Sequence, residues 1–150
     1  MSIEYRVGNL LEQEDLTHMA HQANLYKTFG SGIARAIKEK FPRAYEADQR
    51  SVGVLGTWSV SDGTPTIFNL YTQKGISSVD RVTSYDHLDT TLRALERNLA
   101  VSQRPVRLGI PDHLGCGLAH GDWKIVLAML QSIFETSNVQ LVICKLPSAF

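Results

Sequence analysis

Apolar residues recur along the chain at two spacings, and the shorter spacing predicts strands. In six segments the apolar residues alternate with polar ones or run without a break, and turn-forming residues bound each segment. These segments are Ile3 to Val7, Leu16 to His21, Val52 to Val60, Thr66 to Tyr71, Val106 to Ile110 and Val139 to Leu146. Between the third and the fourth, the stretch from Ser61 to Pro65 is typical of a hairpin turn.

The longer spacing predicts three helices, each with an apolar residue every three or four positions. The stripes consist of Ile33, Ile37 and Phe41; of Leu88, Leu92, Leu95 and Leu99; and of Trp123, Val126, Leu127, Leu130, Ile133 and Phe134. Ser84 and Asp122 stand where they can cap the second and third helices, and Pro42 lies just past the end of the first. Strands that alternate with helices predict an α/β fold: a three-layer α/β/α sandwich around a mixed, mostly parallel sheet.

Length and composition limit the number of domains and the kinds of ligand that this protein can bind. The 150 residues fit one domain, which we expect to span residues 1–150. The 15 basic side chains balance the 15 acidic ones, which argues against a protein that binds nucleic acid or a membrane through a broad positive field. The two cysteines, Cys116 and Cys144, lack C-x-x-C spacing, and His18 and His21 point to opposite faces of one strand, so no metal site is predicted.

The N-terminal segment lacks a positive start followed by an apolar core, and no apolar run approaches the roughly 20 residues that span a bilayer. We therefore expect a cytoplasmic monomer that binds a small molecule.

Two segments that leave a predicted strand and enter a helix carry the features of anion-binding loops. They run from His21 to Ala34 and from Ile110 to Trp123, and each contains two glycines spaced by one residue. Such glycines let backbone N–H groups approach an anion, and the following helix offers its positive end. Together they predict a clamp for a diphosphate. The dinucleotide fingerprint and the P-loop are both absent, which disfavours ordinary NAD and ATP folds. We expect the irregular stretch from Gly75 to Thr83 to cover part of the same site.

Read together, the motifs resemble the macro domain family over nearly the whole chain. Gly8-Asn9-Leu10 is similar to the family's opening G-D-[IL], with Asn in place of Asp. The other motifs resemble the branch of ADP-ribose 1''-phosphate phosphatases, terminal ADP-ribose glycohydrolases and phage members. In that branch H-x-x-N is followed by G-x-G-I-A and K-[FY]-P, and later by G-[CA]-G-[IL] and D-W. The matching residues are His21 to Asn24, Gly30 to Ala34, Lys40 to Pro42, Leu114 to Leu118, and Asp122 with Trp123.

The resemblance implies a site for ADP-ribose or a close derivative and no cofactor. Leu10 would contact the adenine, and Asn24 would bind the distal ribose. Backbone amides of the two loops would surround the diphosphate and that ribose, at Gly30, Ser31, Gly32, Ile33, Leu114, Gly115, Cys116, Gly117, Leu118 and Ala119. The acidic residue that accepts a hydrogen bond from the adenine amino group would fall near Thr17, with Asp15 or Glu14 as substitutes.

The resemblance also suggests catalysis. His21 and Asp122 match residues of the phosphatase-type members, and we predict that they act as an acid–base or nucleophile pair. The leading hypothesis is hydrolysis of ADP-ribose 1''-phosphate. The lysine and aspartate of the glycohydrolase fall on Gln73 and Ala119. The alternatives are a reader of, or a hydrolase for, ADP-ribosylated protein or nucleic acid, and a nucleotide-using α/β enzyme of another family.

Each candidate also has a structural interpretation. His21 is a residue that can be buried and hydrogen-bonded in the core. Asp122 suits the N-cap of the last helix, and Asn24 suits a turn. The paired glycines are typical of tight turns, and Cys116 beside a helix N-terminus is a candidate for a reactive thiol or an inert one.

Overall fold

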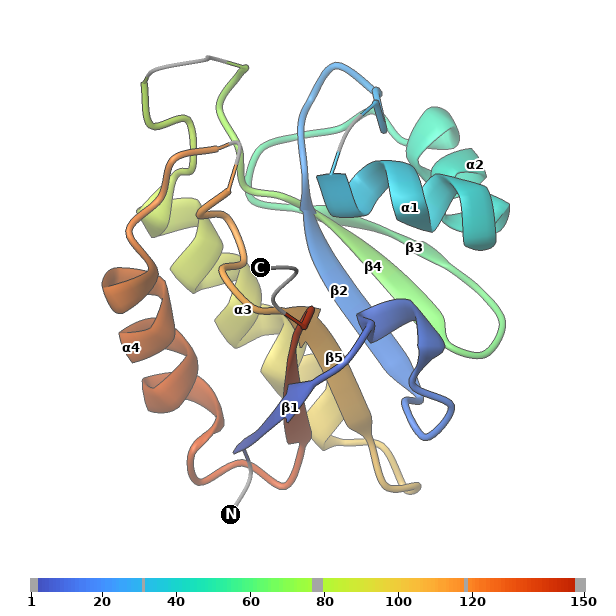
Figure 1. The fold of residues 1–150 in the computed structure, drawn as a ribbon, viewed down its shortest axis with the longest axis vertical. Helices are drawn as coiled ribbons and strands as arrows, with labels where there is room; N and C mark the ends of the chain where they lie inside the picture. The colour runs from blue at the N-terminus through green and yellow to red at the C-terminus, as the bar shows by residue number, and fades with distance from the viewer. Residues whose placement is uncertain (1–2, 31, 77–79, 118, 148–150) are drawn as a thin grey trace.

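The computed structural model describes residues 3–30, 32–76, 80–117 and 119–147. They form a six-stranded sheet with four α-helices (Figure 1). The strands are β1 (Ile3–Val7), β2 (His18–Ala23), β3 (Trp58–Ser61), β4 (Thr66–Tyr71), β5 (Arg107–Pro111) and β6 (Gln140–Lys145). The helices are α1 (Gly32–Lys40), α2 (Pro42–Arg50), α3 (Tyr85–Ala100) and α4 (Trp123–Phe134), with a 3₁₀ turn, η1 (Leu10–Glu12).

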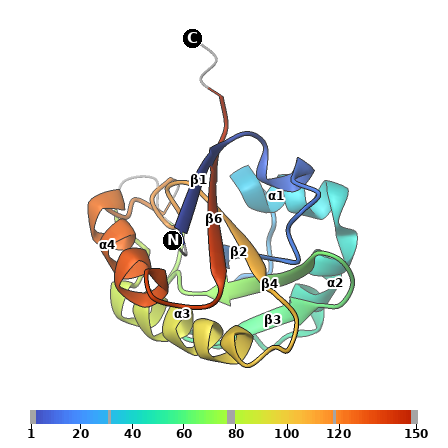
Figure 2. The same ribbon diagram turned by 90° about the horizontal axis from the view of Figure 1, so that it is seen from below.

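The sheet is mixed and mostly parallel, as the alternation of strands and helices predicts. Its order is β1-β6-β5-β2-β4-β3, and only the pairing of β3 with β4 is antiparallel. The predicted hairpin turn between β3 and β4 is therefore confirmed. Helices α1 and α2 cover one face of the sheet and α3 and α4 the other, so the three-layer sandwich is confirmed as well (Figure 2).

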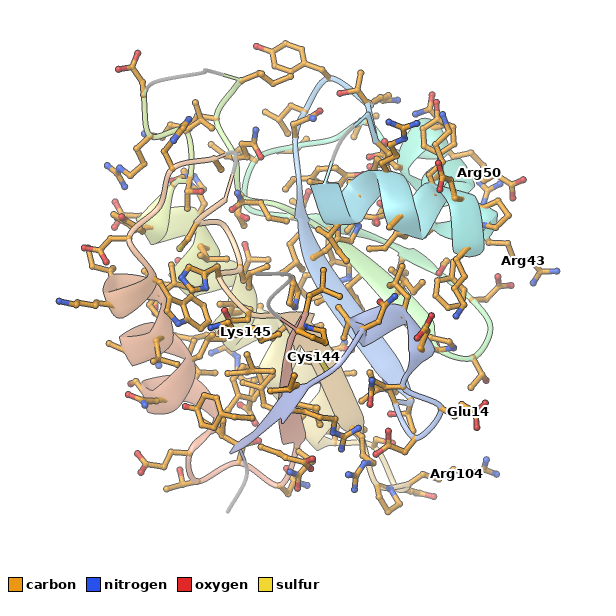
Figure 3. All side chains as sticks on the ribbon, viewed as in Figure 1. Glu14, Arg43, Arg50, Arg104, Cys144 and Lys145 are labelled. Carbon is orange, nitrogen blue, oxygen red and sulfur yellow. The ribbon has the colours of Figure 1, made fainter. Side chains whose placement is uncertain are left out.

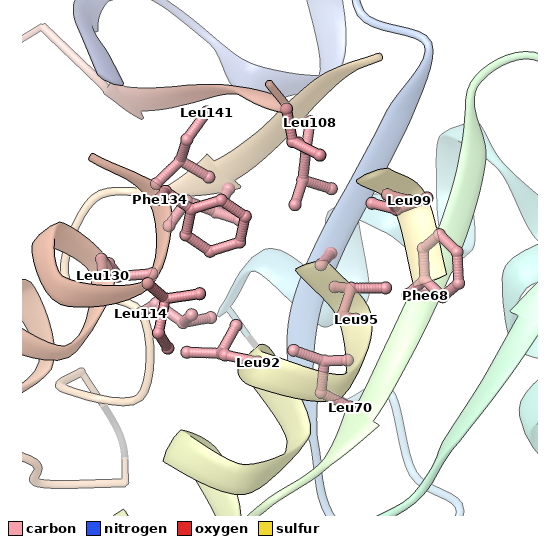
Figure 4. Packing of buried hydrophobic residues seen from close by; sticks show 14 of the residues in the cluster. Phe68, Leu70, Leu92, Leu95, Leu99, Leu108, Leu114, Leu130, Phe134 and Leu141 are labelled. Atoms are coloured by element: carbon pink, nitrogen blue, oxygen red, sulfur yellow. The ribbon is translucent and has the colours of Figure 1, made fainter. Parts of the chain in front are cut away.

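Each face of the sheet carries its own hydrophobic core. Strand β6 shows the division: Leu141 and Ile143 pack on the α3/α4 side, whereas Val142 and Cys144 pack on the α1/α2 side. Successive side chains of a strand point to opposite faces, so a continuous apolar run supplies both cores. On the α3/α4 side, Phe134 and its neighbours from the two helices close over the strands (Figure 4). Each fully buried side chain of this kind contributes roughly 1.5 to 3 kcal/mol.

The caps predicted for the last two helices are present. The side chain of Ser84 accepts from the backbone N–H of His87, and that of Asp122 accepts from the N–H of Lys124 at 2.9 Å. Both residues satisfy backbone donors that the first helical turn leaves without a partner. Helices α3 and α4 thus begin where the sequence predicts.

Two strands have bounds that differ clearly from the prediction, and one helix was not predicted. Strand β2 starts at His18 and continues to Ala23, and the strand predicted from Val52 to Val60 is reduced to β3. Val52 is 87% exposed, so its apolar side chain reflects no burial in a sheet. Helix α2 has no counterpart in the prediction, because its buried residues are two alanines and Asp48 rather than a stripe of large apolar side chains. Pro42 opens this helix, since proline is well suited to a first helical position.

None of the helices in the described residues combines the length and the apolar character that crossing a bilayer requires. The same residues also contain no group of three or more His, Cys, Asp or Glu side chains arranged to hold a metal ion.

Candidate functional site

A cleft of about 1130 Å³ opens at the carboxyl ends of the parallel strands. Residues that follow these strands line it: Asn9 and Leu10 after β1, Asn24 after β2, Gln73 after β4, Asp112 to Gly115 after β5, and Leu146 after β6. Parallel strands bring their carboxyl ends to one edge, which is where α/β sheets place ligand sites. The cleft therefore lies where the two glycine-containing loops were predicted to meet.

Both predicted loops contribute to the cleft. Gly30, Gly32 and Ile33 line it from the first loop, and Leu114, Gly115, Gly117 and Ala119 line it from the second. Ser31 and Leu118, also predicted to contact the ligand, lie outside the described residues. Cys116 is not among the lining residues, and its thiol donates to the carbonyl of Leu114 at 3.3 Å.

Hydrogen bonds to the segment before α3 hold the second loop in place. The hydroxyl of Thr83 donates to the carbonyl of Gly115, and the N–H of Val82 donates to the carbonyl of Ala119 at 2.9 Å. Gly121 turns back so closely that its N–H donates to Gly115 O at 3.0 Å. These bonds hold the second loop in a fixed conformation at the edge of the cleft.

Asn24 organises the first loop from within. Its Oδ1 accepts from the N–H of Tyr26 at 2.8 Å, and its Nδ2 donates to the hydroxyl of Thr28 at 3.0 Å. The next turn is held by Gln49, whose amide donates to the carbonyl of Lys27 at 2.8 Å, while Lys27 Nζ donates back to Gln49 O at 3.1 Å. Asn24 thus makes the contacts of a turn-stabilising side chain, which is its structural interpretation, and it also lines the cleft.

The two ends of the cleft differ in chemistry. At the β1 and β6 end, Leu10, Cys144 and Leu146 form what we call the apolar end. At the β2 and β4 end, the side chains of Gln22 and Gln73 line the cleft, and we call this the amide end. Such a gradient suits an elongated ligand with a flat, weakly polar group at one end and hydroxyl groups at the other.

Comparison with known proteins identifies the fold. The human protein named ADP-ribose glycohydrolase OARD1 is 27% identical over 146 residues, which is 96% of this chain and 91% of the relative. An uncharacterized 17.5 kDa protein of Enterobacteria phage T4 is 27% identical over 155 residues, covering 95% of this chain and 96% of the relative. No family model matches the sequence.

Among solved structures, a Bacteroides thetaiotaomicron protein of unknown function aligns with a TM-score of 0.82 and 20% identity, over 97% of this chain and 98% of its own. The macrodomain of Mycobacterium tuberculosis DarG aligns with a TM-score of 0.74 and 24% identity, again over 97% and 98% of the two chains. The chain has the macro domain fold.

The position of His21 in this macro domain does not support the predicted proton-transfer role. The ring is fully buried, lies edge-on to Phe29, and is not among the residues that line the cleft. Burial lowers the pKa of His21 to about 4, despite a hydrogen bond to Asn69. These contacts are the ones expected from the structural interpretation of His21, a buried ring that is hydrogen-bonded in the core.

Asp122, the other half of the predicted pair, is exposed at the start of α4 and outside the cleft lining. Its carboxylate serves as the N-cap described above. Its backbone N–H donates to the hydroxyl of Tyr85 at 2.8 Å. His21 is buried and Asp122 is exposed at the start of α4, so neither residue of the predicted catalytic pair lines the cleft.

The acidic residue proposed for the adenine is also misplaced. Thr17 precedes β2, and its hydroxyl binds His18 Nδ1 and the backbone of Arg107. Asp15 forms ion pairs with Arg6 at 2.9 Å and with Arg107 at 3.0 Å, and hydrogen bonds from Arg6 lower the pKa of this carboxyl. Glu14 lies at the same end of the molecule (Figure 3). These residues stand at the amino end of β2, opposite the cleft.

Side chains that the sequence analysis did not single out also line the cleft. They are Gln22, Gln73, Asp112, His113, His120 and Lys145. Lys145 and Cys144 end β6 (Figure 3). The ring of His113 stacks on Trp123 at 5.1 Å between centroids and its Nδ1 binds the carboxylate of Asp112. The Asp-His pair directly after a predicted strand was a signal that could have been used, because strand ends face the ligand in this fold.

Gln73 occupies the position that the resemblance assigns to a catalytic lysine, and its carboxamide is engaged within the protein. Its Nε2 donates to the carbonyl of Gly75 at 2.6 Å. Gln22 accepts from the hydroxyl of Thr72 at 2.8 Å and donates to that of Thr83 at 3.0 Å. The side chains that define the amide end are therefore two neutral carboxamides, both hydrogen-bonded within the protein.

Proposed function

We propose that this macro domain binds ADP-ribose in the cleft and hydrolyses derivatives that carry a group on the distal ribose, with ADP-ribose 1''-phosphate as the first substrate to test. The observation that carries the proposal is that both glycine-containing loops line one cleft at the carboxyl ends of the strands. Backbone N–H groups and helix N-termini bind a diphosphate without lysine or arginine.

The two ends of the cleft give the ligand a direction. The apolar end, with Leu10 and Leu146, suits adenine, because a flat base gains from contact with apolar side chains. The amide end offers carboxamides and Asn24 for the hydroxyl groups of the distal ribose. The diphosphate then lies between the two loops, beside Gly32 and Gly115. The cleft volume of about 1130 Å³ is ample for a ligand of this size.

The relatives support both parts of the proposal. A solved structure of Thermosipho africanus DarTG in complex with ADP-ribose aligns over 96% of this chain and 42% of its own, at a TM-score of 0.74 and 16% identity. The human relative is named an ADP-ribose glycohydrolase. Hydrolysis at the distal ribose would release ADP-ribose from either a phosphate ester or a modified macromolecule.

A specific observation also favours a second candidate, a reader that binds ADP-ribosylated macromolecules without cleaving them. Gln73 and Ala119 stand at the positions where the resemblance expects the lysine and the aspartate of a glycohydrolase. The carboxamide of Gln73 cannot form the covalent adduct that a lysine forms with the ribose, and the methyl group of Ala119 cannot act as a carboxylate.

Two measurements on the purified protein test these functions. Titration calorimetry with ADP-ribose should give saturable binding, with ATP and NAD as control ligands. Incubation with ADP-ribose 1''-phosphate should release inorganic phosphate, and incubation with ADP-ribosylated protein and DNA tests release of ADP-ribose. Binding without release from any substrate would support the reader, and a failure to bind ADP-ribose would reject both candidates.

A further inference from the structure

His120 differs from the other ionisable side chains of the cleft in where it lies. Five described lining residues are ionisable: Asp112, His113, His120, Cys144 and Lys145. Four of them belong to the ends of β5 and β6 or follow directly, toward the apolar end. His120 follows Ala119, whose carbonyl accepts from the N–H groups of residues 82 and 83 on the β4 side. It is therefore the ionisable lining residue whose chain neighbour is hydrogen-bonded to Thr83, the bridge partner of Gln73 at the amide end.

The backbone on both sides of His120 is held in place. On one side, the carbonyl of Ala119 accepts from Val82 N at 2.9 Å. On the other, Gly121 packs so tightly that a Cβ there would lie 2.5 Å from the carbonyl oxygen of Gly115. His120 itself has φ of 60°, a conformation that non-glycine residues adopt rarely and that recurs at functional sites. This backbone keeps His120, an exposed residue, in the lining of the cleft.

The contacts of His113, the other histidine of the cleft, fix the side of the cleft on which it lies. His113 is stacked on Trp123 and bound to Asp112, and both contacts hold it on the α4 side. At the amide end the carboxamides of Gln22 and Gln73 cannot carry a proton at neutral pH. An imidazole can accept and return a proton in that range. A hydrolytic step at the distal ribose therefore has one described lining residue of suitable chemistry on its own side of the cleft.

We infer that His120 is the catalytic general acid–base of this macro domain, an inference that rests on the proposed function. With ADP-ribose 1''-phosphate, a water oxygen attacks phosphorus while the imidazole takes the proton of that water. The bond between phosphorus and O1'' breaks, and the imidazole returns the proton to O1''. The products are ADP-ribose and inorganic phosphate, and the histidine ends in its starting state.

Two substitutions of His120 test the role without straining the loop. Asn tolerates a φ near 60° and has no group that accepts a proton at neutral pH, so His120→Asn should keep the backbone conformation. We expect kcat for phosphate release to fall by about 100-fold or more, the usual contribution of a general acid–base. The Kd for ADP-ribose should change less than about threefold, because the diphosphate contacts are made by backbone groups. His87→Gln, on α3 and outside the cleft lining, is the matched control and should retain the wild-type kcat.

Chemical rescue separates catalysis from a structural role. His120→Gly removes the ring at a position where glycine is conformationally favoured, and added free imidazole should restore part of kcat in this variant but not in His87→Gln. A wild-type kcat in His120→Asn, or a loss of kcat that imidazole does not restore, overturns the inference while the proposed function stands. Wild-type protein that binds ADP-ribose but hydrolyses no substrate overturns both the inference and the hydrolytic part of the proposed function.

Discussion

His21 Nε2 and Asn69 Oδ1 lie 2.6 Å apart inside the protein, and the contacts of the asparagine determine which atom donates. Asn69 Nδ2 donates to the carbonyl of Ala44 and to the hydroxyl of Ser59, both at 2.9 Å, so its Oδ1 is the acceptor. The imidazole therefore carries its proton on Nε2. Its Nδ1 is buried and has no hydrogen-bond partner among the described residues. A second proton on this ring would place an unpaired charge in the core.

This relationship makes the stability of the protein depend on pH. Burial lowers the pKa of His21 from 6.5 to about 4, so between these values the unfolded chain binds a proton that the folded chain does not. By linkage, the folded state is favoured above pH 6.5 and loses stability as the pH falls toward 4. We expect His21 alone to remove about 3 kcal/mol of the free energy of unfolding over that range. Urea denaturation at several pH values measures it.

The control for this prediction is His21→Gln, whose amide can still donate to Asn69 but does not titrate. The variant should show a clearly shallower decrease of unfolding free energy between pH 6.5 and 4.5. An equal slope in the two proteins would mean that other groups cause the acid destabilisation.

Gly121 is predicted to be essential for the shape of the second loop. A Cβ at this position would meet the backbone oxygen of Gly115 at 2.5 Å, and a backbone atom cannot rotate away as a side chain can. We expect Gly121→Ala to displace the amides of that loop and to weaken ADP-ribose binding by about tenfold or more, equivalent to about 1.4 kcal/mol. Titration calorimetry gives the change in Kd.

Gly75→Ala is the comparison for this substitution. A Cβ at Gly75 would be 3.7 Å from the hydroxyl of Tyr26, an ordinary contact, so its Kd should stay near the wild-type value. If the two variants bind ADP-ribose equally well, the packing of Gly121 does not control the loop.

The thiol of Cys116 is predicted to be unreactive although it lies in the second loop. Burial, with smaller contributions from the carboxylates of Asp122 and Asp112, raises the pKa of Cys116 to about 11. At pH 7.5 on the order of one thiol in a thousand or fewer is then the nucleophilic thiolate. Alkylation by iodoacetamide, followed by mass mapping of the Cys116 peptide, should be at least about tenfold slower in the folded protein than in urea. Equal rates in the folded and unfolded protein would contradict the prediction.

Much of the fold was predictable because its signals are local. The apolar stripe from Leu88 to Leu99 and the cap at Ser84 predict α3, and the continuous apolar run of β6 predicts a strand buried on both faces. The glycine pairs also marked the two cleft loops. Helix α2 was not predictable in this way, because its buried face is made of alanines and of Asp48, which accepts from the hydroxyl of Tyr71 at 2.6 Å across the layer boundary.

The candidate site was predictable only in part. Leu10, Asn24 and the glycines line the cleft, since the end of a strand and the start of a helix fix where a loop lies. His21 and Asp122, the predicted catalytic residues, do not line it. Whether His21 faces the cleft or the core depends on Phe29 and Asn69, which are distant from it in the sequence or separated by a turn.

The amino-acid sequence by itself determined most of the elements, their order and the two glycine-containing loops, because periodicity, caps and turns act over a few residues. Only the tertiary structure decided that His21 is buried, that Asp122 caps a helix outside the cleft lining, and that His120 lines the cleft on a loop held by residues 82 and 83. The reason is physical: burial and proton affinity depend on which distant segments pack around a side chain, and no local pattern records that packing.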